Sequence, residues 1–178
     1  KGRMGGVGFD IGSFGNRRVA MGSPVFFVNE KIQTHERLII SGFDAHHIIK
    51  VLRFKAGDPI TVSDGISSWG VGTIEVVDAR NNVIYVKILE KDSIKDIEPA
   101  ITLIQALPKG DKMDFILQKN TELGVCKFWP VHTERTVVEL SGGKAERRRE
   151  RWQTVVREAS KQCGRVDIPE VSEPCNFD

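Results

Sequence analysis

The stretch that decides the fold is residues 101–135, ITLIQALPKGDKMDFILQKNTELGVCKFWPVHTER. It begins with a short apolar run, residues 101–107, of the kind that forms a buried strand. A Pro-Lys-Gly turn ends that run. Asp111 can then cap a helix, and Asp114 stands three residues later, where a capping partner belongs. The pattern therefore predicts a strand followed closely by a helix.

The predicted helix is amphipathic and leads into a second strand. Four apolar side chains fall on one of its faces: Met113, Ile116, Leu117 and Leu123. Gly124 stands where a left-handed residue ends a helix, and residues 125–131 form the next apolar run. A strand, a helix and a strand in this order predict two parallel strands of an α/β sheet.

Residues 1–23 are rich in glycine and show no sustained periodicity, so we interpret them as a leader or extension. Gly6 and Gly8 suggest the start of a dinucleotide-binding fingerprint, but Ile11 stands where the third glycine is required. An oxidoreductase that binds a nucleotide cofactor is therefore disfavoured.

Residues 24–94 read as a small, mostly β unit of short strands and tight turns. Asp64-Gly65 is a strong hairpin signal, and Asp44 can cap a short helix. Gly70 and Gly72 interrupt one strand, where a bulge would suit a small closed barrel. Polar residues 91–99 are the predicted linker to a second domain at 98–178.

A long helix is predicted over residues 144–163, with Gly164 at its C-terminal cap. Its core stripe has clean helical spacing: Trp152, Val155, Val156, Ala159 and Cys163. A second stripe at the same spacing is polar: Glu158, Lys161, Gln162 and Arg165. This stripe either faces solvent or holds a phosphate or carboxylate. Residues 166–171 follow as a short strand.

Composition narrows the possible functions. The chain has 178 residues, 40% of them apolar and 28% charged, and a net charge of only +2. Residues 109–165 carry 13 basic and 8 acidic side chains, which is weakly compatible with a polyanionic partner. Three widely spaced cysteines indicate neither a disulfide framework nor a zinc site. No apolar run is long enough to span a membrane.

Two groups of basic residues could bind an anion. Lys109, Lys112 and Arg135 follow predicted parallel strands, and loops after such strands open on one edge of the sheet. Arg165 is expected nearby. In the β unit, His47, Arg53 and Lys55 cluster around the short helix, where contact with a nucleic-acid backbone is possible. Adjacent histidines point in different directions on a helix and lack a third ligand, so no metal site is expected.

Four segments, in order, resemble the signature segments of the RsmE family of ribosomal small-subunit RNA methyltransferases. They are HHIIKVLRFKAGDPITVSDG at 46–65, LPKGDKMDFILQKNTELGV at 107–125, PVHTERTV at 130–137 and RWQTVVREASKQCGRVDIPEV at 151–171. The resemblance implies a PUA-like β-barrel followed by an α/β domain of the SPOUT class, which ends in a knot. It also implies a cytoplasmic homodimer that uses S-adenosylmethionine, without a metal, to methylate N3 of a uridine in 16S rRNA.

The resemblance also suggests roles for individual residues. Arg135 is expected to stabilise the uracil anion or to position a phosphate, and Glu158 is the candidate for orienting Arg135. Contacts to RNA are expected from His47, Arg53, Lys55, Lys109, Lys112, Lys161, Gln162 and Arg165. The family's glycine-rich cofactor segment does not occur in this sequence, so we expect this chain alone to lack the cofactor site. The alternative is a non-catalytic RNA-binding module.

Overall fold

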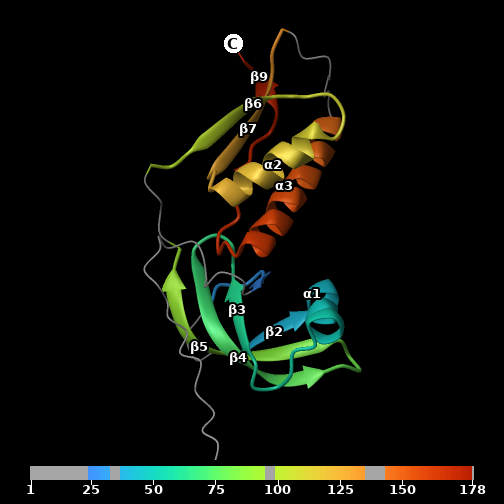
Figure 1. Cartoon of the computed structure of the whole chain (residues 1–178), viewed down its shortest axis with the longest axis vertical. Helices are drawn as coiled ribbons and strands as arrows, with labels where there is room; N and C mark the ends of the chain where they lie inside the picture. The colour runs from blue at the N-terminus through green and yellow to red at the C-terminus, as the bar shows by residue number, and fades with distance from the viewer. Residues whose placement is uncertain (1–23, 33–36, 95–98, 135–142, 178) are drawn as a thin grey trace, which may run out of the picture.

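The computed structural model describes residues 24–32, 37–94, 99–134 and 143–177 of the chain. Two lobes lie end to end along its long axis (Figure 1). The first half of the chain forms a β lobe, and the second half forms an α/β lobe. Within these residues, no helix is long and apolar enough to cross a membrane.

The β lobe is one curved five-stranded sheet with a short helix at its side (Figure 1). Its strands are β1 (Val25–Phe27), β2 (Arg37–Ser41), β3 (Pro59–Ser63), β4 (Ser68–Asp78) and β5 (Val83–Ser93). The strand order is β1-β3-β4-β5-β2. β1 and β3 are parallel, and the other pairs are antiparallel. β1 and β2 are the edge strands, so no pairing between them closes a cylinder among the described residues.

Alternating apolar residues build the core of this lobe. Ile84, Val86 and Ile88 of β5 are fully buried, because successive side chains of a strand point to opposite faces. Helix α1 (Gly42–His46) packs beside them and continues directly into the π-helix η1 (His47–Leu52). The prediction that Asp44 caps this helix is wrong: Ser41 occupies the cap position. Asp44 lies inside the first turn, and its carboxylate binds Lys161 of the other lobe.

The predicted bulge in β4 is confirmed. The pairing of β4 with β5 shifts register between Val71 and Gly72, and again between Ile74 and Val76. At Gly72 a Cβ atom would lie 2.4 Å from the backbone oxygen of Lys87. The two strands therefore approach so closely there that only glycine fits. These shifts increase the bend of the sheet.

The hairpin predicted at Asp64-Gly65 is also confirmed, and Asp64 organises it. Its carboxylate accepts hydrogen bonds from the N–H groups of Ile66, Ser67 and Ser68 at 2.7–3.0 Å, and from the hydroxyls of Ser67 and Ser68. Burial acts to raise the pKa of Asp64, but the hydrogen bonds from Ser68, Ser67 and Ile66 outweigh it and lower the pKa to about 2. The ionised carboxylate is thus the form that holds the turn.

This arrangement predicts a pH-dependent contribution of Asp64 to stability. The pKa is lowered from 3.8 to about 2 on folding, so the contribution is complete above pH 3.8 and is lost as the pH falls through 2. Because Asp64 is only partly buried and solvent screens its carboxylate, we expect Asp64→Asn to cost only about 1 kcal/mol near neutral pH. Urea unfolding of both proteins between about pH 6 and pH 2 measures the difference. A difference that stays constant across this range would contradict the assignment.

The α/β lobe has a parallel sheet with two helices on one face (Figure 1). Its elements are β6 (Thr102–Ala106), α2 (Lys112–Leu123), β7 (Lys127–His132), α3 (Gly143–Cys163), β8 (Glu170–Val171) and β9 (Cys175–Asn176). β7 is the central strand, with β6 on one side and both β8 and β9 on the other. Met113, Leu117, Phe128, Trp152 and Val156 form its core. The predicted strand–helix–strand unit and the core stripe of α3 are confirmed.

Two details of α2 differ from the prediction. Leu123 is 79% exposed, and the buried face of the helix runs through Met113, Leu117 and Thr121 instead. Thr121 can be buried because its hydroxyl donates to the backbone oxygen of Leu117 at 2.8 Å. Asp111 is at the N-cap but makes no side-chain cap hydrogen bond. Tertiary contacts thus override the spacing of apolar residues.

The predicted linker begins too early. Strand β5 continues to Ser93, which pairs with Ser68 of β4, and Ile94 donates its N–H to the Ser67 oxygen at 2.9 Å. Residues 91–93 therefore belong to the sheet. The predicted helix ends at Gly124 and Gly164 are confirmed, since both glycines have positive φ angles, 102° and 71°.

Candidate functional site

The carboxyl ends of the parallel strands β6 and β7 form one edge of the α/β lobe, as predicted. The two strands end together, because the Leu107 N–H donates to the Val131 oxygen at 3.0 Å. β9 joins this edge beside Val131 and His132. The loops that leave the strands here open on the same side. We call this the carboxyl edge: residues 107–112, 131–134 and 175–177.

Lys109 and Lys112 are exposed at the carboxyl edge, and neither forms an ion pair with another described residue. Gly110, with a φ angle of 68°, makes the tight turn between them. The two nearby acids, Asp111 and Asp114, are paired with Arg151 of α3 at 3.5 and 2.5 Å. Arg151 offsets only one of these two negative charges, but together with Lys109 and Lys112 it leaves this end of α2 net positive and therefore attractive to anions.

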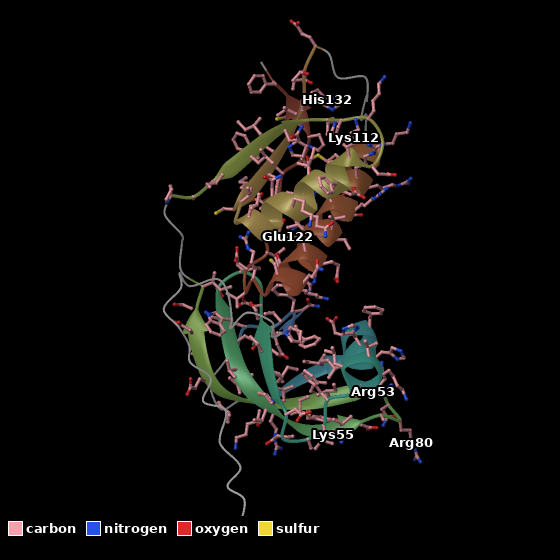
Figure 2. The ribbon with its side chains drawn as sticks, viewed as in Figure 1. Arg53, Lys55, Arg80, Lys112, Glu122 and His132 are labelled. Carbon is pink, nitrogen blue, oxygen red and sulfur yellow. The ribbon has the colours of Figure 1, made fainter. Side chains whose placement is uncertain are left out.

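Arg135, the predicted catalytic residue, lies outside the described residues. Directly before it, Thr133 is half-buried and Glu134 is exposed at the carboxyl edge. The structure also brings His132 to this edge, which the sequence analysis did not single out. Figure 2 shows His132 and Lys112 at the same end of the α/β lobe. Its position as the last residue of β7, at the carboxyl end of a parallel strand, is the signal that could have identified it.

Arg165 does not lie near the lysines of the carboxyl edge. It is 2% exposed, and its guanidinium forms a two-point ion pair with Asp167 at 2.6 and 3.2 Å. Another nitrogen donates to the oxygens of Thr121 and Val125, at 2.8 and 2.9 Å. These carbonyls end α2, so Arg165 holds the end of the helix that is opposite to Lys112. Its donors are satisfied internally and are not directed at a phosphate.

The polar stripe of α3 also lies away from the carboxyl edge. Lys161 binds Asp44 of the β lobe at 3.0 Å and Glu158 at 3.1 Å. Gln162 is exposed. Because α3 runs from the α/β lobe to the β lobe (Figure 1), these residues lie near the junction of the lobes. The structure therefore separates Glu158, Lys161 and Gln162 from Lys109 and Lys112.

The basic residues predicted in the β lobe surround the end of η1. Arg53 ends this helix with a positive φ angle of 57°, and Lys55 follows it; both are exposed. The His47 ring is half-buried and stacks on Phe43 at 6.5 Å between centroids. Figure 2 places Arg53 and Lys55 at the side of the β lobe remote from Lys112, together with Arg80 of the β4–β5 turn. The sequence analysis did not include Arg80.

Two cavities among the described residues lie at the junction of the lobes and not at the carboxyl edge. Their volumes are about 580 and 430 Å³, and Val28, Asn29, Glu30 and Arg157 line both. No group of three side chains within the described ranges is arranged to hold a metal ion.

Each lobe matches the model of a known protein family. A model of the RNA methyltransferase PUA domain matches residues 40–84, and a model of the RNA methyltransferase domain matches residues 96–178. The ribosomal RNA small subunit methyltransferase E of Bacillus subtilis is 31% identical over 151 residues, which are 83% of this chain and 57% of that protein. The chain belongs to the RsmE family of RNA methyltransferases.

Other RsmE proteins give the same result. The Synechocystis protein of the same name is 37% identical over 74% of this chain and 41% of its own length. The crystal structure of the Neisseria gonorrhoeae protein, bound to S-adenosyl methionine, superposes with a TM-score of 0.73 at 34% identity, covering 86% of this chain and 63% of that one. This RsmE chain thus spans about two fifths to two thirds of the length of the relatives that it matches. The α/β class with a PUA-like lobe and a SPOUT-type lobe is confirmed.

Proposed function

We propose that this chain contributes the RNA-contacting part of an enzyme that transfers a methyl group from S-adenosylmethionine to N3 of a uridine in 16S rRNA. In this proposal, residues 24–94 are an RNA-binding domain, and residues 98–178 are the first part of the methyltransferase domain. The enzyme acts as a cytoplasmic homodimer. Family membership supports the reaction. The proposed RNA contact is supported by two exposed lysines at the carboxyl edge, Lys109 and Lys112, which form no ion pair with another described residue.

The chemistry requires a cation near the reacting base. N3 of uracil carries a proton that must leave before or during attack on the methyl group, and negative charge then develops on the ring. Arg135, three residues after the end of β7 in the sequence, is the proposed cation. Lys109 and Lys112 would hold the RNA backbone beside it. Arg53, Lys55 and His47 would bind the backbone at the other lobe.

S-adenosylmethionine supplies the methyl group, but the described residues do not fit it. Such a ligand needs a concave pocket that buries most of its surface, and the two cavities described above lie at the lobe junction instead. The carboxyl edge presents exposed lysines and the exposed Phe177, not an enclosed pocket. For this reason we also consider a second function, that of an RNA-binding module that has no methyl transfer activity of its own.

Lysine substitutions test the RNA contact that both functions require. For single-stranded RNA, log K falls as log salt concentration rises. Each phosphate contact that is lost makes this negative slope less steep by about 0.7. We expect Lys109→Ala and Lys112→Ala each to make the slope less steep by this amount, and the double variant by about 1.4. Fluorescence anisotropy with a labelled RNA stem-loop that carries a uridine in its loop gives these slopes.

Lys119→Ala is the matched control. Lys119 is on the same helix, but its ammonium is paired with Glu122 at 2.9 Å, so its loss should leave the salt slope unchanged. If the wild-type chain binds RNA and neither Lys109 nor Lys112 affects the slope, the RNA does not contact the carboxyl edge and the proposal fails.

A further inference from the structure

The two lobes meet along a continuous set of contacts made by α3 and the segment after it. The Lys161 ammonium lies 3.0 Å from the carboxylate of Asp44, which belongs to α1 of the β lobe. The two side chains are only 17% and 21% exposed. An ion pair that is this well shielded is screened little by salt. Glu158 also lies 3.1 Å from the Lys161 ammonium, so removing Lys161 leaves the carboxylates of Asp44 and Glu158 without the cation that they share.

A second contact lies one turn earlier on α3. The Arg157 guanidinium donates to the Phe27 oxygen at 3.2 Å and lies over the Phe27 ring, 5.2 Å from its centroid. Phe27 is the last residue of β1. Arg157 thus combines a hydrogen bond with a cation–π contact on one residue of the other lobe. Lys161 and Arg157 stand four residues apart, so both point from the same face of the helix.

The backbone completes the junction. The Ser63 hydroxyl donates to the Val166 oxygen at 2.5 Å, and the Ile168 N–H donates to the Gly65 oxygen at 2.9 Å. At Gly65, whose φ angle is 76°, a Cβ atom would lie 2.6 Å from Cδ1 of Ile168. The hairpin of the β lobe therefore packs directly on the segment that follows α3. The lobes are therefore joined both by side chains of α3 and by hydrogen bonds to the backbone of the segment that follows α3.

We propose that Lys161 is a positioning residue, whose ion pair with Asp44 sets the β lobe at a defined position relative to the carboxyl edge. This rests on the proposed function. Two of the proposed RNA-binding residues, Arg53 and Lys55, lie on the β lobe. A third, Lys112, lies on the α/β lobe, far from them in the molecule (Figure 2). One RNA can engage both groups only if their separation matches its own geometry. A rigid junction maintains that separation before RNA binds, which removes an entropic cost of binding.

The proposal differs from direct RNA binding by Lys161, and charge reversal separates the two. Lys161→Asp places two carboxylates together and should open the junction. Asp44→Lys places two ammonium groups together and should do the same. The double variant Asp44→Lys/Lys161→Asp restores an ion pair with the charges exchanged. If Lys161 only positions the lobes, the double variant recovers RNA binding although an aspartate now stands on α3.

The experiment measures shape and RNA affinity in parallel. Small-angle scattering of the chain without RNA should show a larger radius of gyration for each single variant and the wild-type value for the double variant. Affinity for the labelled stem-loop should fall about tenfold in the single variants and return in the double variant. Lys119→Asp makes the same charge change at a lysine whose ammonium is paired within α2, with Glu122, and should alter neither the radius nor the relative affinity by a comparable amount.

Two results would overturn the proposal. One is an unchanged radius of gyration in both single variants. The other is a double variant with wild-type shape but the poor affinity of Lys161→Asp, which would mean that Lys161 touches RNA itself. Because the shape is measured without RNA, a chain that binds no RNA at all would refute the proposed function and still report on the junction. Circular dichroism of each variant checks folding.

Discussion

Replacing Arg165 with alanine is expected to lower the free energy of unfolding by about 3–5 kcal/mol. Arg165 is 2% exposed and is bonded to Asp167, which is itself buried, and to two carbonyls at the end of α2. Its removal leaves the Asp167 carboxylate without its guanidinium partner, and the carbonyls of Thr121 and Val125 lose the hydrogen bonds that Arg165 donates. Urea unfolding followed by far-ultraviolet circular dichroism measures the loss.

Arg151→Ala is the matched control for this prediction. Arg151 also bridges α3 to α2 through carboxylates, those of Asp114 and Asp111, but its side chain is 60% exposed. Exposed ion pairs contribute little, so this variant should unfold close to the wild type. Arg165→Lys should stay strongly destabilised, because an ammonium cannot replace a planar guanidinium with several fixed donors. Equal losses for Arg165→Ala and Arg151→Ala would contradict the interpretation of Arg165 as an internal brace.

Gly72→Ala is expected to cost about 3 kcal/mol, although alanine normally favours the folded state by restricting the unfolded chain. The added Cβ would lie 2.4 Å from the Lys87 oxygen and 3.1 Å from its carbonyl carbon. Both atoms belong to the backbone of β5, so relief requires the β4–β5 pairing to move and not merely a side chain to rotate. Thermal and urea unfolding of the variant measure the cost.

Gly143→Ala supplies the comparison. Nothing lies within 4 Å of a Cβ atom built at Gly143, the first residue of α3. The same chemical change should therefore be neutral or should stabilise the chain by up to about 1 kcal/mol. If Gly72→Ala proves as harmless as Gly143→Ala, the close approach of β4 and β5 is not a constraint on that position.

Local signals in the sequence predicted most of the fold. The glycines at 124 and 164 ended their helices as expected, and Gly72 lies at a bulge. Failures occurred where a distant partner decided the outcome. Asp44, Asp111 and Asp114 each stand where a carboxylate could cap a helix, but Lys161 and Arg151 bind them instead.

The candidate site shows the same division. Lys109 and Lys112 were predicted from their place after a strand, and the parallel pairing of β6 with β7 brings their loop to the expected edge. Arg165 shares helical spacing with Lys161. The helix ends at Cys163, as Gly164 predicted, but spacing along one helix could not reveal that Arg165, just beyond this end, turns inward. Spacing describes one helix, whereas burial depends on the helix beside it.

The sequence by itself determined the order of elements, the α/β class and the family of this chain, because periodicity, turn residues and signature segments are local properties. Only the tertiary structure decided which charges are available. Arg165 and Lys161 look like Lys109 and Lys112 in the sequence, yet the first two are paired across α2 and the lobe junction while the other two remain exposed. The physical reason is that the ability of a charged side chain to bind a ligand depends on its solvation and on its ion-pair partners, and the tertiary fold determines both.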